Sequence, residues 1–302
     1  MSIIVCDNIS LNYGSHRALD GLSFQLDDNG PVALVGPNGA GKTSLISCLC
    51  GYQKPDSGLI SVFGHSPGSP ALIGRVTALP QDAKLDARFS IQEQLIYLAR
   101  LQGLSHAQAH EQTKRVLAQV DLTDAATKLP GTLSHGMNKR VSIAQTLLGQ
   151  PELVLLDEPT AGLDPANTRA IRDLIKSLSK QTRFIISSHN LDELEKLCTH
   201  VLYIDKGKLT KTLNVDNSGT AEGYLTLKMA QCDDIKLVEA LIGLAGITQV
   251  ETVSPGEFVL HTVPGHSPQL EITILTLIAK HSWQYRLLLN GRTLEDSLFS
   301  TH

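Results

Sequence analysis

The 302-residue sequence contains no long run of apolar residues. Its longest uncharged apolar stretches, at 153–156 and 272–279, are far shorter than the roughly 20 residues that a membrane-spanning helix requires. The N-terminal segment has no basic region, and Asp7 interrupts its apolar positions, so it does not resemble a secretory signal. We therefore expect a chain that crosses no membrane and stays in the cytoplasm.

Cysteine is rare and shows no pairing pattern. The five cysteines are an odd number and include no CxxC pair, which argues against a disulfide framework and against a zinc site. Two of them stand two positions apart on a predicted helix and face different directions, so they are poor joint metal ligands. We interpret the whole set as small buried or half-buried residues: Cys6, Cys48, Cys50, Cys198 and Cys232.

The sequence also lacks an excess of basic residues. Its formal net charge is −4, whereas domains that bind nucleic acid usually carry a basic surface or stripe. We therefore expect no nucleic-acid partner. A local basic patch is the alternative that the net charge leaves open. Hydrophobic residues at 42% and charged residues at 19% are ordinary for a globular protein and exclude a largely disordered chain.

The length of the chain allows two ordinary domains, and the pattern of apolar residues predicts where they divide. Residues 215–223 are polar and rich in turn formers, as a linker should be. We therefore predict domains at 1–214 and 215–302.

The first domain is predicted to be α/β. Short strands at 2–5, 17–20 and 22–26 predict an antiparallel layer ahead of the main sheet. Strand and helix alternate afterwards, which is typical of a largely parallel sheet with crossover helices, giving a mixed sheet core. These elements are strands at 31–35, 75–80, 153–156, 184–187, 201–204 and 208–213, with helices at 43–50, 166–179 and 190–198. Helical patterns from 90 to 148 predict a helical subdomain at about 82–148.

The second domain is predicted to be small and α+β. Its expected order is β-α-β-β-α-β, like the ferredoxin-type sandwich. The strands are predicted at 224–229, 247–252, 256–262 and 283–289, and the helices at 233–244 and 267–280.

Residues 36–43, with the sequence GPNGAGKT, fit the P-loop pattern GxxxxGK[ST]. Its glycines let backbone N–H groups surround phosphate oxygens at a helix N-terminus. We expect Lys42 to reach the β- and γ-phosphates of ATP and the Thr43 hydroxyl to ligate Mg²⁺. A simple glycine turn is the alternative, which the preceding strand and following helix disfavour. The predicted phosphate-binding residues are Gly36, Pro37, Asn38, Gly39, Ala40, Gly41, Lys42, Thr43 and Ser44.

A pair of carboxylates follows the apolar strand at 153–156. Asp157 is placed to position Mg²⁺ through water, as the second half of a P-loop metal site. Glu158 is placed to polarise a water molecule for attack on the γ-phosphate. A solvated acidic pair at a strand end is the alternative, but beside a P-loop the pair predicts hydrolysis and not transfer to an alcohol.

Four further segments resemble those of the ATP-binding cassette ATPases, over roughly residues 1–213. They are Gln81 in LPQD, the stretch LSHGMNKR at 133–140, AGLD at 161–164 and His189 in SSHN. In their order they are similar to the Q-loop, signature, D-loop and switch histidine of that family. The resemblance implies a P-loop NTPase cassette fold and the hydrolysis of ATP with Mg²⁺.

The resemblance also implies roles for single residues. Gln81 would reach Mg²⁺ or the attacking water, and His189 would donate to the γ-phosphate. Three more residues would contact nucleotide: Ser134 and Gly136 in the signature and Asp164 in the D-loop. The signature would contact an ATP that is held by a second copy of the chain. The working site would then lie between two cassettes. Simpler readings stand beside these: Ser134 caps a helix in any case, and His189 would also suit a buried structural position.

Tyr13, in LNYG ahead of the P-loop, stands where the family uses an aromatic ring to stack on adenine. A purely structural tyrosine near a turn is the alternative. The signature is a variant, because His135 and Met137 replace the usual glycine and glutamine. These departures leave the prediction of nucleotide binding in place, but they leave the rate of catalysis open. For His135 we favour the interpretation that it is an exposed helix residue without a role.

The function predicted from these residues is that of the ATP-hydrolysing subunit of a transporter. Its membrane-spanning partner would be a separate chain, and two cassettes would form a homodimer or heterodimer at the cytoplasmic face of the membrane. A cassette ATPase that acts on ribosomes or DNA is the alternative, disfavoured because the chain has one cassette and neither a coiled coil nor a zinc insertion. A P-loop kinase is disfavoured by Glu158.

Within transporters, three segments resemble the cassettes of ABC-2 type exporters. They are PTAGLDP at 159–165, the LSxGM form of the signature and the tail at 293–299, which has Ser297 where valine is usual. We therefore expect an exporter.

Overall fold

The computed structural model describes residues 2–27, 30–195, 197–214, 223–263, 268–293 and 298. The chain forms two compact units, Met1–Asn214 and Val215–His302, each with its own sheet and core. Most of the stretch predicted as a linker, and most of the tail at 293–299, lie outside the described residues.

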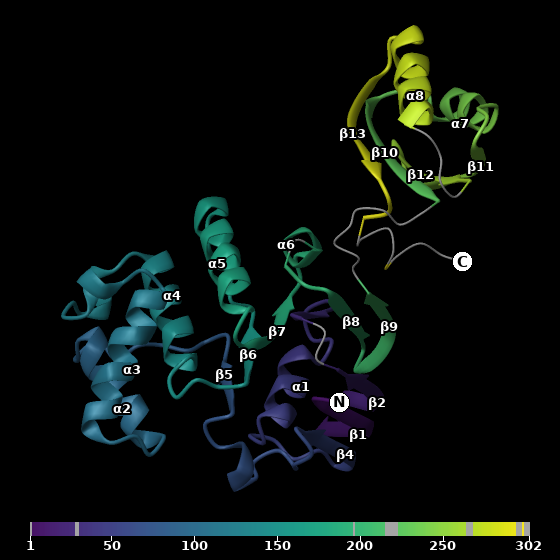
Figure 1. Cartoon of the computed structure of the whole chain (residues 1–302). Helices are drawn as coiled ribbons and strands as arrows, with labels where there is room; N and C mark the ends of the chain where they lie inside the picture. The colour runs from purple at the N-terminus through teal and green to yellow at the C-terminus, as the bar shows by residue number, and fades with distance from the viewer. Residues whose placement is uncertain are drawn as a thin grey trace. The chain divides into compact units, whose positions relative to one another are not determined.

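A six-stranded sheet forms the centre of the first unit (Figure 1). Its strand order is β5-β6-β7-β3-β8-β9, and all pairs are parallel except the last. The strands are β3 (Val32–Val35), β5 (Val76–Leu79), β6 (Leu153–Asp157), β7 (Arg183–Ser188), β8 (His200–Asp205) and β9 (Lys208–Asn214). β3 and β6 are buried at every position, which explains their unbroken apolar sequences.

An antiparallel layer of three strands, in the order β2-β1-β4, covers helix α1 (Lys42–Leu49) from the side opposite the six-stranded sheet. Its strands, β1 (Ile4–Tyr13), β2 (His16–Leu26) and β4 (Ser57–Val62), are longer than predicted or, for β4, not predicted at all. The two strands expected at 17–20 and 22–26 are one strand. Gly21 adopts φ +64° inside it and its N–H donates to the Ser10 hydroxyl, so a residue typical of turns is accommodated in the ladder.

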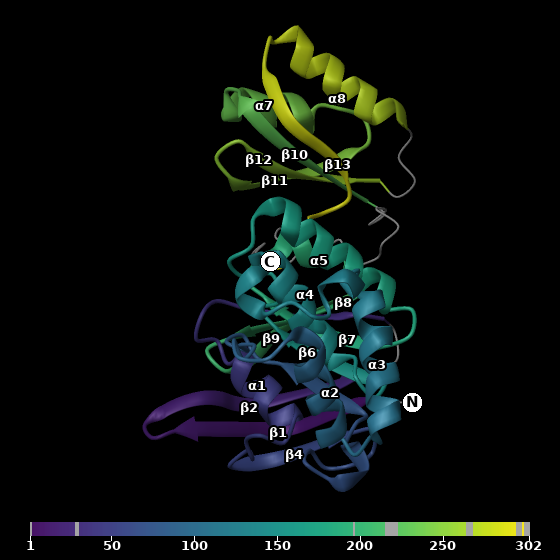
Figure 2. The same cartoon turned by 90° about the vertical axis from the view of Figure 1, so that its left-hand side faces the viewer.

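Helices α2 (Ile91–Leu101), α3 (His106–Gln119) and α4 (His135–Thr146) gather as a separate group beyond β5 (Figures 1 and 2). Ser90 and Ser105 begin the first two of these helices with capping boxes, in which side chain and backbone satisfy each other's free groups. Short 3-10 turns at Thr123–Ala125 and Pro130–Thr132 connect α3 to α4, and another at Pro70–Leu72 lies between β4 and β5. Helices α5 (Pro165–Leu178) and α6 (Leu191–Glu195) follow β6 and β7.

The second unit is a four-stranded antiparallel sheet with two helices packed on one of its faces. The sheet order is β11-β12-β10-β13. The elements are β10 (Tyr224–Gln231), α7 (Asp234–Ile242), β11 (Ile247–Ser254), β12 (Glu257–Thr262), α8 (Pro268–Lys280) and β13 (Gln284–Asn290). Alternate residues of β10 and β12, including Leu225, Leu227, Phe258 and Leu260, form its core with the helices.

In the part of the chain that the structure describes, no helix combines the length and the apolar character needed to cross a bilayer. All five cysteines are free, and they are buried or half-buried as predicted. Burial raises the pKa of the Cys6 thiol to about 12, so this residue is kept protonated and unreactive.

Candidate functional site

Four neighbouring strands end at one edge of the six-stranded sheet and deliver the predicted site residues there. Gln81 follows β5, Asp157 ends β6 and Glu158 comes next, His189 follows β7, and the P-loop follows β3. Because these strands are parallel and adjacent, their carboxyl ends lie side by side, where ligands of open α/β sheets bind. The fold therefore assembles residues from positions 36 to 189 at a single place.

The P-loop wraps back on the side chain of Lys42. Its ammonium group is buried and donates to the carbonyl oxygens of Gly36, at 2.7 Å, and Pro37, at 3.2 Å. Gly41 precedes helix α1 with φ +110°, and a Cβ there would lie 2.5 Å from the Ala18 carbonyl oxygen. This position therefore requires glycine, both for the left-handed backbone and for the close approach of β2.

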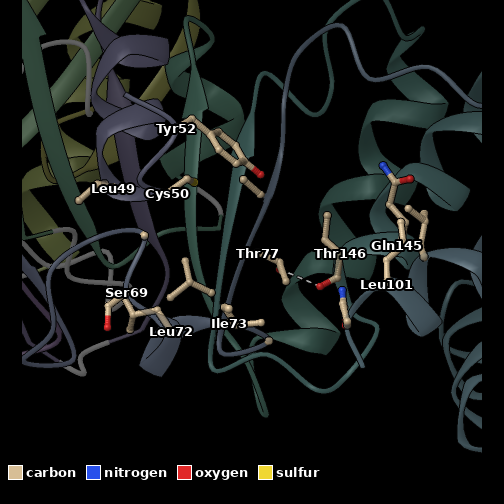
Figure 3. A pocket seen from close by; sticks show the side chains of 16 residues that line it. Leu49, Cys50, Tyr52, Ser69, Leu72, Ile73, Thr77, Leu101, Gln145 and Thr146 are labelled. Carbon is tan, nitrogen blue, oxygen red and sulfur yellow. Dashed lines mark hydrogen bonds between the residues drawn. The ribbon is translucent and has the colours of Figure 1, made fainter. Parts of the chain in front are cut away.

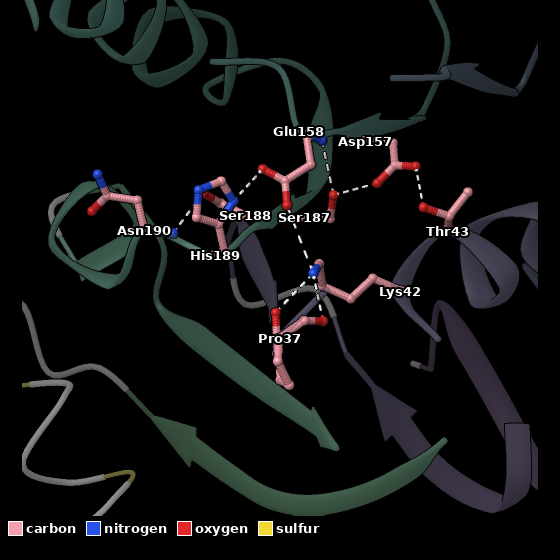
Figure 4. A network of polar contacts seen from close by, with 10 residues as sticks. Pro37, Lys42, Thr43, Asp157, Glu158, Ser187, Ser188, His189 and Asn190 are labelled. Atoms are coloured by element: carbon pink, nitrogen blue, oxygen red, sulfur yellow. Dashed lines mark hydrogen bonds and ion pairs between the residues drawn. The ribbon is translucent and has the colours of Figure 1, made fainter. Parts of the chain in front are cut away.

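Asp157 is held by two hydroxyl groups (Figure 4). Thr43 Oγ1 donates to Asp157 Oδ2 at 2.7 Å, and the Ser187 hydroxyl donates to the other carboxylate oxygen. The carboxylate is almost fully buried, with 1% of the residue exposed. The hydroxyl and carboxylate predicted to serve Mg²⁺ therefore face each other, and oxygen donors of this kind are the ligands that Mg²⁺ prefers.

Glu158 lies next to Asp157 in a strained conformation. Its φ is +48°, a region that disfavours residues with a Cβ, and its N–H donates to the Ser187 hydroxyl at 2.8 Å. The carboxylate is buried between Lys42 Nζ, at 3.7 Å, and His189 Nδ1, at 3.0 Å. An ionised carboxylate in this contact would accept a hydrogen bond from His189 Nδ1.

A cavity of about 390 Å³ opens beside this network. It is lined by P-loop residues 38–44 together with Tyr13, Gln81, Glu158 and His189. The tyrosine ring is half exposed and so is available to a ligand. The structure thus brings together the residues predicted around the nucleotide from all four strand ends and from the antiparallel layer.

The predicted signature and D-loop residues are placed elsewhere. Ser134 is the N-cap of α4, where its hydroxyl accepts from the Met137 N–H at 3.2 Å, and Asp164 is the N-cap of α5. Neither they nor Gly136 line the cavity beside the P-loop. Ser134 and Asp164 are exposed.

Sequence reasoning missed several residues of the site. Ser187 joins the two carboxylate residues, but its only signal in the sequence is its place two residues before His189. His16 and Ala18 line the cavity because β2 returns past the P-loop. Lys139, which belongs to the predicted signature stretch, does not line the cavity. Burial lowers the pKa of its ammonium group, and the negative charge of Asp157 opposes this lowering.

A second cavity, of about 460 Å³, lies between the sheet core and the helical group (Figure 3). Ile73, Tyr52 and Leu101 line it and are each more than two thirds exposed. Thr77 of β5 donates to the Thr146 carbonyl oxygen at 2.8 Å and joins its two walls.

Comparison with known proteins identifies the family. A family model described as ABC transporter matches residues 19–161. The linearmycin resistance ATP-binding protein LnrL of Bacillus subtilis is 31% identical over 314 residues, which covers 97% of this chain and 100% of that protein. The chain belongs to the ABC transporter ATP-binding proteins.

Further relatives of this ABC ATP-binding protein match over about two thirds of its length. The bacitracin transport ATP-binding protein BcrA of Bacillus licheniformis is 36% identical, covering 72% of this chain and 71% of that protein. The Nod factor export ATP-binding protein I of Burkholderia lata is 35% identical, covering 67% of each chain.

Solved structures share the fold of the first unit. The chain is similar to a subunit of the CbiONQ ABC transporter complex from Clostridium perfringens, with a TM-score of 0.64 and 26% identity over 71% of this chain and 89% of that one. A nucleotide-free ATP-binding cassette gives a TM-score of 0.63 at 24% identity, over 72% of this chain and 92% of its own. The predicted cassette fold and its class as an ATP-hydrolysing enzyme are thereby confirmed.

Proposed function

We propose that this ABC ATP-binding protein is the ATP-hydrolysing subunit of an exporter and works as a cassette dimer on a separate membrane-spanning subunit. The observation that carries the proposal is the buried Glu158 carboxylate, held between Lys42 and His189 at the mouth of the P-loop cavity. Such a carboxylate can accept the proton of a water molecule that attacks the γ-phosphate.

ATP would bind along the P-loop. The backbone N–H groups at the start of α1 and the Lys42 ammonium would bind the phosphates, and Tyr13 at the cavity wall would stack on the adenine. Thr43, Asp157 and Gln81 would hold Mg²⁺, which supplies charge neutralisation for the phosphate oxygens. Their oxygen donors fit this ion, since a hydroxyl and a carboxylate already meet at 2.7 Å.

Glu158 and His189 would then divide the chemical work. Glu158 accepts the proton of the attacking water, and its strained backbone holds it at the cavity. His189 orients Glu158 through Nδ1 and presents Nε2 to the cavity, where a second proton would let it donate to the γ-phosphate.

Ser134 and Gly136 would serve the nucleotide of a second cassette. They lie outside the cavity of their own chain, and the Ser134 hydroxyl is exposed at the start of α4, where backbone N–H groups favour an anion. One half of each working site would thus come from each cassette. A related cassette has been described as a dimer with ADP and phosphate.

The second cavity is the docking site that we propose for the membrane-spanning subunit. Its exposed apolar residues would be covered there by a short cytoplasmic segment of the partner. β5 borders this cavity, and the loop that follows it carries Gln81 to the nucleotide cavity, so one continuous segment lines both cavities. The ATP-binding protein would therefore lie at the cytoplasmic face of the membrane without entering it.

Export is supported by the relatives whose names mention antibiotic resistance, bacitracin transport and Nod factor export. For the second unit we propose a ferredoxin-type fold. Its chain order β-α-β-β-α-β, with the last strand beside the first in the sheet order β13-β10-β12-β11, supports this assignment.

The test of the proposed function is Glu158→Gln. This variant keeps the P-loop and Asp157, so it should still bind Mg-ATP while hydrolysis falls by roughly 10²- to 10⁴-fold, the usual contribution of a general base. Unhydrolysed ATP should then hold two cassettes together. Light scattering that finds a monomer at saturating ATP, or hydrolysis at the wild-type rate, would contradict the proposal.

A further inference from the structure

The signature segment and the D-loop meet within one chain, at the neighbouring N-termini of α4 and α5. Gly136, in the first turn of α4, packs directly against the side chain of Asn167, in the first turn of α5. A Cβ at Gly136 would lie 2.2 Å from Asn167 Oδ1 and 2.6 Å from Asn167 Cγ. No side chain fits between the helices here while Asn167 keeps its position.

Asn167 is in turn fixed to the end of the D-loop. Its side-chain Nδ2 donates to Asp164 Oδ2 at 2.6 Å, and its backbone N–H donates to Asp164 Oδ1 at 2.9 Å. The Ala166 N–H also donates to Oδ1, at 3.0 Å. These hydrogen bonds hold the pKa of Asp164 below its ordinary value, and the bond from the Asn167 backbone N–H has the largest effect. Asp164 is therefore an oriented carboxylate and not a freely rotating one.

The other end of the D-loop belongs to the nucleotide cavity. Glu158 and Ala161 both line that cavity, and the Ala161 N–H donates to the Glu158 carbonyl oxygen at 3.2 Å. His135 of the signature lies over the same loop, with Nε2 3.8 Å from where a Cβ of Gly162 would be. A continuous set of contacts thus runs from the chain's own Glu158 to its signature.

We propose that Asn167 is a positioning residue that couples the two nucleotide sites of the cassette dimer. The inference rests on the proposed function, in which the signature binds the partner's ATP. When that ATP engages the signature, the contact of Gly136 with Asn167 sets the position of Asp164 and of the loop that begins at Glu158. Each chain's Glu158 therefore becomes competent only when its partner is loaded.

The test measures the ATP dependence of hydrolysis by Asn167→Ala. Wild type should show a Hill coefficient above one, because one loaded site prepares the other. In the variant the coefficient should fall to one and kcat by roughly 2- to 30-fold, the range for residues that modulate coupling. The half-saturating ATP concentration should change little, since Asn167 does not line the cavity. Lys176→Ala, an exposed change near the end of α5, is the matched control and should behave as wild type.

Gly136→Ala gives an independent arm. Its added methyl should displace the Asn167 amide, so adding Asn167→Ala to Gly136→Ala should cause no further loss. The inference would be overturned if the double variant lost activity by the product of the two single-variant losses. It would also be overturned if Asn167→Ala left the Hill coefficient unchanged. If either of these results is found and the Glu158→Gln variant still dimerises with ATP, only the coupling role of Asn167 has failed. If the Glu158→Gln variant does not dimerise with ATP, the proposed function has failed as well.

Discussion

Lys42 and Glu158 set the electrostatics of the site at the scale of single residues. Their charged groups are 3.7 Å apart and each side chain is 7% exposed, so neither is screened effectively by water. A buried charge that loses its partner is costly, commonly by about 3–5 kcal/mol. ATP therefore meets a lysine that already has a counter-charge, and its phosphates compete with Glu158 for the ammonium group.

Ser134→Arg and Lys42→Ala together test whether each site is shared between two cassettes. Ser134→Arg should abolish hydrolysis and leave the nucleotide affinity of the single subunit unchanged, because Ser134 does not line its own cavity. Lys42→Ala should abolish hydrolysis by weakening phosphate binding. Circular dichroism should first show that both variants are folded, since Lys42→Ala leaves Glu158 without its partner.

Mixing the two inactive variants distinguishes independent sites from coupled sites. Activity returns if each site fires singly, whereas the mixed dimer stays inactive if Glu158 requires a loaded partner, as proposed for the coupling through Asn167. Half of randomly paired dimers are mixed, and each mixed dimer has one intact site, so about a quarter of all sites can fire if sites act singly. Loss of ATP affinity by Ser134→Arg alone would show instead that Ser134 serves its own chain. An inactive mixture, with mixed dimers shown to form, would mean that the two sites must fire together.

At the scale of elements, the sequence predicts those parts of the site that follow buried strands. β6 and β7 contain the apolar runs LVLL and FII, and chemistry-bearing residues follow each run, so both strand and site could be predicted from one pattern. β4 was missed because its first three residues are exposed and Gly58 interrupts the pattern. That strand exists through its pairing with β1, which no local signal announces.

The limits of prediction at the site have the same physical origin. Gln81 and His189 were found by their order along the chain, whereas Ser187, His16 and Asn167 act through contacts with residues distant in sequence. A serine two residues before a histidine, or an asparagine two residues after a proline, has many possible roles. Only the neighbouring strands and helices decide which role it takes.

The proposed docking cavity gives a prediction at the same scale. Ile73→Asp and Leu101→Asp place charges on side chains that are 69% and 67% exposed, so stability and ATP hydrolysis without the partner should change little. A charge in an apolar contact should prevent co-purification with the membrane-spanning subunit and its stimulation of hydrolysis. Ile235→Asp, 73% exposed on α7, is the matched control outside the cavity. Equal partner binding by all three variants would place the docking site elsewhere.

At the scale of the whole molecule, the first unit has the means to fold without the second. Its core includes residues of all three strands of the antiparallel layer, of α1 and of the main sheet. The second unit likewise buries Leu225, Leu227, Phe258 and Ile274 among its own elements. The two cores contain no common residue, so each unit is expected to be stable alone.

Truncation after Asn214 should therefore leave a folded cassette with unchanged ATP affinity, because every residue that lines the nucleotide cavity precedes position 190. If the second unit contributes contact energy to cassette closure, its removal should change ATP-driven dimerisation, or the stimulation of hydrolysis by the membrane-spanning subunit. Dimerisation is measured by light scattering in the Glu158→Gln background. Stimulation of hydrolysis is measured by phosphate release in the wild-type background. Unchanged dimerisation together with unchanged stimulation would reject a regulatory role. An insoluble truncation would show that the unit serves to cover the cassette, and a truncation that no longer binds ATP would contradict the independence of the two cores.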